Sequence, residues 1–313
     1  MEKIFIVVVC GATASGKTRL AIDLAKRFDG EIVSADSMQI YKKLDIASAK
    51  PTEEEKAGIP HHLMDFLEPT TPFSVADYVP LAREVIADIH SRGKLPIICG
   101  GTGLYINSLV DNIEFDDTGS DPSFREEMKK LAEEQGNGAV LEKLRGVDPE
   151  SAARLHENNL SRVIRALEVY HISGKTMTQV QAESRLKPSP YEPCMMMIDY
   201  EDREVLYERI DRRVDIMIES GLLEEAEEFF THDDYVTAAQ AIGYKELKAY
   251  FDGTAELAEC VENLKRETRR YAKRQLTWFK KDIRINRISS SNSTNYEEIL
   301  ENAEKLVKKY SIL

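Results

Sequence analysis

Residues 4–18, IFIVVVC followed by GATASGKT, decide the fold of this 313-residue chain. The second part, from Gly11 to Thr18, matches the pattern G-x-x-x-x-G-K-[ST]. An apolar, strand-like run precedes it and the helix-like run RLAIDLAKRF follows it. Because a phosphate-binding loop needs this strand–loop–helix context, the sequence predicts a P-loop at the start of an α/β domain.

Each part of this loop suits a phosphate group. The glycines let the backbone curl so that successive N–H groups face an anion, and the following helix adds the positive end of its dipole. Lys17 supplies a point charge, and the hydroxyl of Thr18 suits Mg²⁺. The alternative is a tight turn with an exposed lysine. The loop alone does not say whether it binds ATP, GTP or another phosphorylated molecule.

Strand-like and helix-like segments alternate in the first third of the chain. The runs EIVSADS (31–37) and LPIICGG (95–101) read as strands, and residues 75–93 read as a helix between them. This alternation predicts a parallel, doubly wound sheet with helices on both faces. The P-loop, Asp36 and Gly100-Gly101-Thr102 all follow such strands, so we expect them to meet in one crevice.

The pattern changes near Phe115. Residues 116–123, DDTGSDPS, are rich in turn formers, and the chain then reads as helical to about Ser189. The run CMMMIDY (194–200) reads as a strand that returns to the sheet, and its methionines as core. We therefore predict a P-loop core from residues 1–114 and 194–313, with basic C-terminal helices, and a helical insertion domain at 115–193. The remainder reads as helical, ending in a polar linker and one amphipathic helix.

Charge is distributed unevenly along the chain. The net charge is −13, which by itself argues against a nucleic-acid partner. Residues 265–287, however, contain ten basic and two acidic residues. Within them Arg269 and Arg270 belong to two cationic rows of one helix, and acidic residues at i±4 are nearly absent. We favour contact with a phosphate backbone over a merely solvated face.

The cysteines and the lengths of the apolar runs indicate in which cellular compartment the protein works. The four cysteines are far apart and form no CxxC pair, so we expect buried, reduced thiols. The run Ile4–Cys10 is short for a signal peptide, and no other run approaches the length of a membrane span. His61 and His62 have no further ligands nearby in the sequence, which favours a structural or substrate-contact role over zinc. We expect a cytoplasmic protein without membrane contact.

Asp36 is the acid that follows a strand beside the P-loop. It could hold a metal through water, act as a general base, or simply cap the next turn. A nucleoside triphosphatase usually places an aspartate after a second apolar strand, but LPIICGG ends in glycines. This difference counts against the alternative of a small-molecule kinase. A non-catalytic RNA-binding protein is a third possibility.

Several longer motifs resemble one family. The runs GATASGKT, ADSMQIYKKLDIASAKP, PHHLMDFLEP, CGGTGLY, SRVIRALEVY, QAIGYKE and TRRYAKRQLTWF occur in the order found in bacterial tRNA dimethylallyltransferases, also called tRNA isopentenyltransferases. The resemblance covers nearly the whole chain. It implies transfer of a dimethylallyl group from dimethylallyl diphosphate to N6 of adenosine 37, 3′ of the anticodon in tRNA, with release of pyrophosphate.

The resemblance also implies roles for individual residues. Asp36 would be the catalytic base, with Thr102 lining the reaction channel and Lys17 assisting the leaving diphosphate. Thr18 would hold Mg²⁺, and the diphosphate would be bound by Gly11, Ala12, Thr13, Ala14, Ser15, Gly16, Lys17, Thr18, Arg209 and Arg213. The tRNA anticodon stem-loop would contact Asp36, Ser37, Met38, Gln39, Thr102, Arg125, Ser161, Arg162, Val163, Ile164, Arg165, Gln240, Gly243, Lys245, Arg269 and Arg270.

The sequence departs from the family pattern in two places. Ala12 stands where the family usually has proline, and residues 156–159 read HENN where an HPN-type stretch is usual. Neither change removes a phosphate ligand or the base, although the second affects the expected tRNA contact of the insertion. The zinc finger of the eukaryotic members is absent from this sequence, which fits a bacterial enzyme. We expect a monomer.

Overall fold

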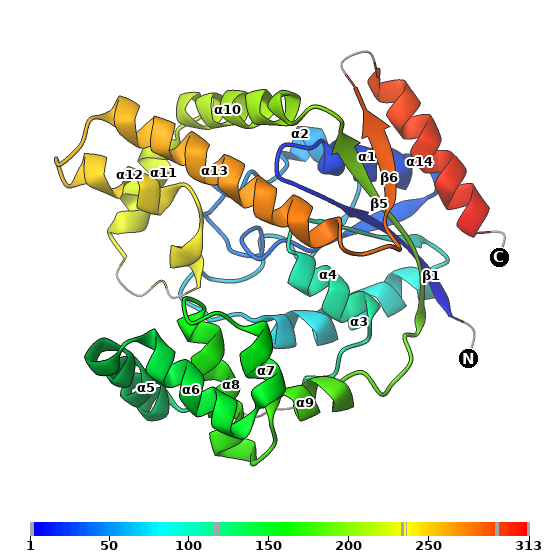
Figure 1. Ribbon diagram of the computed structural model, residues 1–313. Coiled ribbons are helices and arrows are strands. Elements are labelled where there is room, and N and C mark those ends of the chain that lie inside the picture. Colours follow the sequence, from blue (N-terminus) through cyan, green and yellow to red (C-terminus); the bar gives the residue numbers. More distant parts are fainter. Residues whose placement is uncertain (1–2, 116–118, 233–234, 236, 292–293, 312–313) are drawn as a thin grey trace. The chain divides into compact units, whose positions relative to one another are not determined.

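The computed structural model describes residues 3–115, 119–232, 235, 237–291 and 294–311 (Figure 1). The chain divides into two compact units, residues 1–110 together with 190–313, and residues 111–189. The sequence placed the two boundaries at 115 and 193. The first unit contains the β-sheet, and the second unit is helical throughout its described residues.

A six-stranded parallel sheet forms the centre of the first unit. Its strands are β1 (Ile4–Cys10), β2 (Gly30–Ser34), β3 (His61–His62), β4 (Leu95–Gly100), β5 (Tyr191–Tyr200) and β6 (Asn286–Ser290), in the spatial order β3-β2-β4-β1-β5-β6. Strand β1 lies between β4 and β5, with Val7 opposite both Ile97 and Cys194. The predicted parallel sheet is confirmed.

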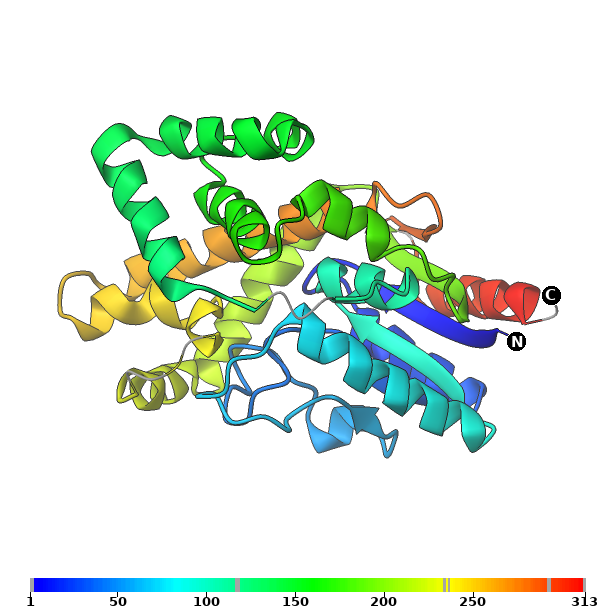
Figure 2. The same cartoon turned by 90° about the horizontal axis from the view of Figure 1, so that it is seen from below.

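Side chains of β1 alternate between the two faces of the sheet, as the pleat requires. Ile6, Val8 and Cys10 pack on one face with helices α3 (Val75–Ser91) and α4 (Gly103–Val110). Val7 and Val9 pack on the other face with helices α1 (Lys17–Arg27) and α14 (Tyr296–Tyr310). Figure 2 shows α3 along its face of the sheet. Because both faces are covered, β1 is apolar throughout rather than alternating.

Further helices extend the first unit beyond the carboxyl ends of the strands. They are α2 (Glu53–Lys56), α10 (Arg203–Glu219), α11 (Leu222–Phe230), the 3₁₀ turn η1 (Ala238–Gln240), α12 (Tyr244–Phe251) and α13 (Leu257–Phe279). Helices α11 to α13 share a third hydrophobic cluster with Ile40, Tyr41 and Leu44, which follow β2. The long helix α13 runs beside α10, as Figure 1 shows. This cluster therefore packs against the loop that carries Asp36.

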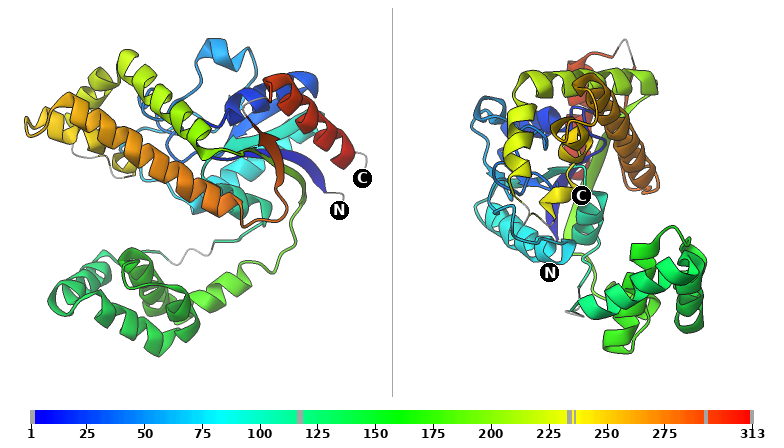
Figure 3. Two further views of the ribbon diagram at one scale, coloured as in Figure 1. Left: turned by 45° about the horizontal axis from the view of Figure 1, so that its top comes forward. Right: turned by 90° about the vertical axis from the view of Figure 1, so that its left-hand side faces the viewer.

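The second unit is a small helical bundle. It contains α5 (Pro122–Gln135), α6 (Asn137–Val147), α7 (Pro149–Arg154), α8 (Leu160–Ser173) and α9 (Met177–Glu183), seen in green in Figure 3. Asp121 and Asp148 cap α5 and α7 by accepting bonds from backbone N–H groups, and a proline follows each cap. Aspartate at the cap and proline in the first turn are favoured helix starts, so the local sequence sets these boundaries.

Two strands were not predicted, and one was predicted too short. The expected helix and linker around residue 286 is wrong, because Asn286–Ser290 forms the edge strand β6 beside β5. Its buried positions are Ile288 and Ser290, and a serine in place of an apolar residue hides the alternation. Strand β3 has only two residues. Strand β5 begins at Tyr191 rather than Cys194.

Other expectations about the core are confirmed. The four cysteines are free and buried. Met195, Met196 and Met197 are each 0% exposed, so they are core residues of β5. No helix among the described residues is long and apolar enough to cross a membrane.

Candidate functional site

The carbonyl groups of the P-loop bond side chains of the protein itself, among them Lys17 Nζ, which donates to Ala12 at 3.4 Å. Ala14 and Gly16 have positive φ angles of 59° and 92°, which curl the loop. The carbonyl oxygen of Ala14 accepts a bond from Arg209 Nε at 2.9 Å, and that of Ser15 accepts one from the Tyr200 hydroxyl at 3.1 Å. Since the first N–H groups of a helix have no intrahelical acceptor, the start of α1 offers donors to an anion.

Gln275 of α13 ties the P-loop to the loop after β4. Its Oε1 accepts a bond from the backbone N–H of Thr13 at 2.8 Å, and its Nε2 donates to the carbonyl of Gly101 at 3.0 Å. A Cβ atom at Gly101 would lie 2.3 Å from that Nε2. A side chain at Gly101 would displace the Gln275 amide, so the second glycine of CGGTG allows this pair of bonds to form.

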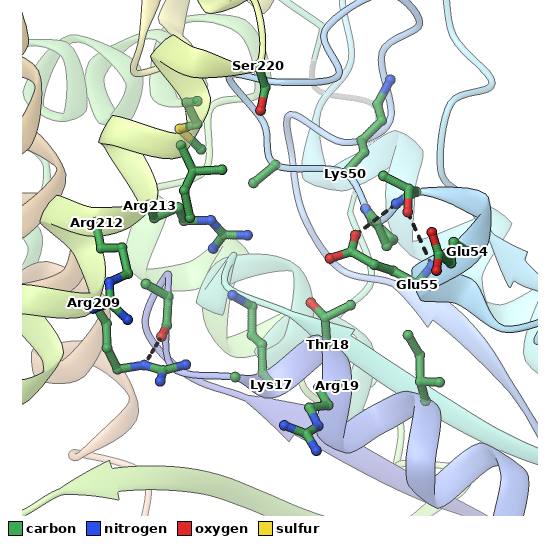
Figure 4. A pocket seen from close by; sticks show the side chains of 18 of the residues that line it. Lys17, Thr18, Arg19, Lys50, Glu54, Glu55, Arg209, Arg212, Arg213 and Ser220 are labelled. Carbon is green, nitrogen blue, oxygen red and sulfur yellow. Dashed lines mark hydrogen bonds between the residues drawn. The ribbon is translucent and has the colours of Figure 1, made fainter.

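A cavity of about 1240 Å³ opens in front of the P-loop (Figure 4). Lys17 and Thr18 of α1 lie beside three arginines of α10, and Glu54 and Glu55 lie across from these arginines. The three arginines are Arg209, Arg212 and Arg213. Among the described residues, none of the three has a carboxylate within salt-bridge distance. The cavity therefore concentrates four cations where the helix start offers its amides, which suits a diphosphate.

The charges in the cavity influence one another. Burial lowers the pKa of Lys17, while Cys99 and Asp36 act to raise it. Burial also lowers the pKa of Arg213, with Glu55 and Asp36 opposing this effect. Desolvated cations gain more from a bound anion than cations in water do, because the local dielectric is lower. Because Asp36 acts on the charges of both Lys17 and Arg213, its carboxylate lies within electrostatic reach of the cavity.

Thr18 has a hydroxyl that suits a hard cation. It lines the cavity beside Lys17 and contacts the thiol of Cys99, whose pKa burial raises to about 11. No group of three or more histidine, cysteine, aspartate or glutamate side chains in the described part of the chain could hold a metal. Magnesium usually keeps several waters and binds substrate phosphates, so one hydroxyl together with a diphosphate fits it.

Asp36 follows β2 and uses one carboxylate oxygen to form a turn. Its Oδ1 accepts bonds from the N–H groups of Met38 at 2.9 Å and Gln39 at 3.4 Å. Asp36 therefore caps this turn, which is one of the roles that its place after a strand allows. The other oxygen, Oδ2, has no hydrogen-bond partner among the described residues. Asp36 can therefore hold its turn and still accept a proton from a substrate.

Thr102 joins the end of β4 to the Asp36 turn. Its Oγ1 accepts a bond from the N–H of Ser37 at 3.0 Å, and its own N–H donates to the carbonyl of Ala35 at 3.1 Å. A Cβ atom at Gly100 would lie only 2.1 Å from that same carbonyl oxygen. The two loops touch through their backbones, as the sequence predicted. Neither Asp36 nor Thr102 lines the cavity in front of the P-loop, so the expected single crevice stays a prediction.

The side chain of Gln39 holds the loop at residues 48–49 in place. Its Nε2 donates to the carbonyl groups of Ser48 at 3.2 Å and Ala49 at 3.1 Å. Gly243, expected to contact tRNA, is buried, and a Cβ there would lie 3.0 Å from Ala47. Lys245 is exposed at the start of α12. The side chain of Gln240 lies outside the described part of the chain.

The basic helix α13 is partly neutralised by its neighbours. Arg269 pairs with Asp211 of α10, and Lys265 pairs with Asp215 of α10 at 2.7 Å. Arg270 pairs with Glu267 at 2.6 Å but stays 61% exposed. Acidic residues at i±4 are scarce along α13, as the sequence indicated, but Arg269 and Lys265 find acidic partners on α10, the helix that α13 packs against.

In the helical unit, the predicted tRNA residues fall into two groups. Val163 and Ile164 are buried at 0% and 5% exposure, so their side chains are core and cannot contact RNA in this fold. Ser161 and Arg162 are exposed at the start of α8. The motif SRVIRALEVY forms a helix, and a helix turns successive residues to different faces, so only some residues of the motif can contact RNA.

Arg125 and Arg165 share one partner inside the helical unit. Glu168 is 0% exposed and accepts bonds from Arg125 Nε at 2.7 Å and Arg165 Nη1 at 2.6 Å. It also accepts the N–H of Asp121 at 2.8 Å, at the start of α5. Arg125 therefore joins α5 to α8, whereas Arg165 lies on α8 with Glu168 and also donates to the carbonyl of Gly119.

Sequence reasoning missed three residues that shape the site. Arg212 follows from the spacing of Arg209 and Arg213 on a helix, and that signal was available. Gln275 and Glu225 act through bonds to distant backbone groups, for which a single sequence carries no pattern.

Comparison with known proteins places this arrangement in a family. A model described as IPP transferase matches residues 39–282, and one described as isopentenyl transferase matches residues 4–65. The chain belongs to the IPP transferase family. It is 52% identical over 300 residues to a tRNA dimethylallyltransferase of Caldanaerobacter subterraneus, covering 95% of each chain. It is 50% identical over 281 residues to that of Bacillus subtilis, covering 90% of this chain and 89% of the other.

Solved structures of the IPP transferase family share the fold. The tRNA isopentenylpyrophosphate transferase of Bacillus halodurans is 40% identical, with a TM-score of 0.73 over 100% of this chain and 99% of the other. A eukaryotic dimethylallyltransferase acting on tRNA is 29% identical, with a TM-score of 0.82 over 99% of this chain and 79% of the other. These likenesses confirm the predicted α/β fold and the resemblance stated from the motifs.

Proposed function

We propose that this enzyme transfers a dimethylallyl group from dimethylallyl diphosphate to N6 of adenosine 37 in tRNA and releases pyrophosphate. Transfer of a dimethylallyl group to tRNA follows from its relatives, which are tRNA dimethylallyltransferases at about 50% identity over most of their length. The observation that carries the chemistry is Asp36 beside the P-loop, with one carboxylate oxygen free of bonds among the described residues. We expect a monomer that works in the cytoplasm, where its tRNA is found.

The donor would bind with its diphosphate in the cationic cavity. Lys17, Arg213 and the amides at the start of α1 would hold the phosphate oxygens, and Arg209 and Arg212 would add charge at the rim. Magnesium held by Thr18 and the diphosphate would neutralise part of the charge on the leaving group. The support for this arrangement is the absence of a carboxylate partner for these arginines within the described chain.

The acceptor amine would approach the free oxygen of Asp36. As the adenine N6 forms a bond to C1 of the allyl group, the bond from C1 to the diphosphate oxygen breaks, and the N6 proton passes to Asp36. The exocyclic amine is a poor nucleophile, so removing its proton during bond formation lowers the barrier. Lys17, Arg213 and the loop amides stabilise the negative charge that develops on pyrophosphate.

The RNA would bring adenosine 37 to this site out of its stack, since the base edge is otherwise covered. Exposed groups available to the anticodon stem-loop include Ser161 and Arg162 in the helical unit and Lys245 and Arg270 in the core. Specificity would depend on unpaired loop bases and on shape, as is usual for RNA.

The test offers the purified protein dimethylallyl diphosphate with unmodified tRNA, and in a parallel reaction ATP with a panel of metabolites. We expect isopentenyladenosine only in the first reaction, detected by mass spectrometry of digested tRNA. Asp36→Asn should lower the transfer rate about 10²- to 10⁴-fold while tRNA binding persists. Phosphoryl transfer in the ATP reaction alone would overturn the proposal, and an unimpaired Asp36→Asn variant would remove the base assignment.

A further inference from the structure

The segment from Leu44 to Pro51 forms one wall of the site. Asp45, Ile46, Ala49, Lys50 and Pro51 line the diphosphate cavity. The same segment supplies the two carbonyl groups that accept the Gln39 amide. The segment therefore borders both the cavity and the turn that carries Asp36. A residue that holds it in place influences the binding of both substrates.

One carboxylate holds this segment at its centre. Glu225 Oε2 accepts the N–H groups of Asp45 and Ile46, each at 2.8 Å, and Oε1 accepts the N–H of Ala47 at 2.9 Å. The Tyr244 hydroxyl donates to Oε1 at 2.8 Å. Three successive amides that converge on one anion form a nest of the kind that binds phosphate in other proteins. Here the protein's own side chain occupies it.

The rest of the fold keeps Glu225 in this position. It lies in the first turn of α11, and Tyr244 begins α12, directly after the buried Gly243. The helices α11 and α12 share a hydrophobic cluster with Leu44 and Ile40. The carboxylate therefore connects a rigid helical layer to a segment without regular secondary structure at residues 44–50.

We propose that Glu225 is a positioning residue for the transfer reaction: it fixes the segment Leu44–Pro51 so that the cavity wall and the Asp36 turn keep their places. This inference rests on the proposed function. Loss of the carboxylate leaves three amides and a hydroxyl without an acceptor, and the segment moves away to hydrate them. A displacement of about 1 Å near the reacting groups is enough to lower a rate about 100-fold.

The experiment compares Glu225→Ala with Glu227→Ala, an exposed glutamate on the same helix. For each variant, kcat and KM are measured for both dimethylallyl diphosphate and unmodified tRNA, at a temperature where circular dichroism shows the variant folded. We expect kcat/KM to fall about 10- to 100-fold in Glu225→Ala and to stay within twofold of the wild type in Glu227→Ala. Adding acetate, which can fill the vacated nest, should restore part of the rate, whereas chloride at equal ionic strength should not.

A second measurement does not depend on turnover. Hydrogen exchange at the amides of residues 45–47 should be slow in the wild type and faster in Glu225→Ala, with the strands of the sheet unchanged. An active wild type whose Glu225→Ala variant keeps its kinetics, or loses rate without rescue by acetate, would overturn the positioning role. A wild type that transfers nothing to tRNA would instead overturn the proposed function, while the exchange result would still report whether the nest holds the segment.

Discussion

The arginines of the cavity and those of the helical unit look alike in sequence but are held differently. Arg209, Arg212 and Arg213 lie on α10 with no carboxylate in salt-bridge distance among the described residues, and they face the P-loop. Arg125 and Arg165 converge on the buried carboxylate of Glu168. Unpaired, partly desolvated cations attract a ligand anion, whereas paired ones stabilise packing. The partner of a cation therefore indicates its role better than the cation itself.

The largest effect should come from removing a cavity cation. Lys17→Met should lower the rate of transfer about 10²- to 10³-fold, because charge that develops on the leaving diphosphate loses a preorganised donor. Arg213→Ala should act in the same direction, with weaker binding of dimethylallyl diphosphate by calorimetry. Steady-state kinetics with both substrates would measure the loss. If Lys17→Met transferred at the wild-type rate, the cavity would not be the diphosphate site.

A pH titration tests a third group of charges, away from the site. Arg92 donates two hydrogen bonds to Glu31, and His62 adds a third contact, which together lower the pKa of Glu31 to about 2. Since the folded-state pKa lies below the unfolded value of about 4.3, the stabilisation is fully present above that value. It disappears as the pH falls toward 2.

The expected loss of unfolding free energy between pH 6 and pH 2.5 is about 2 kcal/mol, measured by denaturant titrations. Glu31→Gln should be less stable than the wild type at pH 6 and should lose less stability on acidification. Parallel curves for the two proteins would show that other carboxylates dominate the acid response.

Removing the shared partner in the helical unit should cost stability rather than chemistry. Glu168→Gln leaves Arg125 and Arg165 without a full countercharge, and their exposed atoms recover part of the loss by hydration, so we expect about 2 kcal/mol. Urea unfolding would show the change, and calorimetry should find binding of dimethylallyl diphosphate intact. A variant as stable as the wild type would show that the ion pairs of Glu168 do not hold the helical unit together.

The smallest effect concerns the exposed arginine next to that pair. Arg162→Ala should weaken tRNA binding and reduce the slope of log K against log salt concentration by about one, since one phosphate contact is lost. Arg165→Lys serves as the comparison, because it keeps the charge but loses the guanidinium that donates to Glu168 and to the carbonyl of Gly119. Fluorescence anisotropy at several salt concentrations would measure both. An unchanged slope for Arg162→Ala would show that Arg162, at the start of α8, does not contact a phosphate of the RNA.

The sequence predicted the parallel sheet, the P-loop and the meeting of Asp36 with Thr102, because each rests on a local pattern. Apolar runs such as Ile4–Cys10 and the glycine spacing of the loop are visible in single segments. Strand β6 escaped because Ser290 occupies a buried position on an edge strand. The bonds of Glu225 and Gln275 also escaped, because each side chain binds backbone groups more than 170 residues away.

The sequence also did not predict correctly which residues of the helices are buried and which are exposed. Val163 and Ile164 were expected to face RNA because their motif was taken as a whole, although a helix of this pattern must bury one side. The same argument, applied to Lys265 and Arg269, would have suggested an acidic neighbour on a packed helix. Helical periodicity thus indicated which face of each helix is packed, but it did not indicate which helix packs against that face.

The amide of Gln275 has a consequence for how the two substrates sense each other. The oxygen of this planar group accepts a hydrogen bond from the N–H of Thr13 in the P-loop, and its nitrogen donates one to the carbonyl of Gly101 in the loop after β4. Neither loop can shift without pulling on the other. Affinities for the isoprenoid and for the RNA should therefore be thermodynamically linked in this enzyme, and substitutions on opposite sides of that plane should combine non-additively.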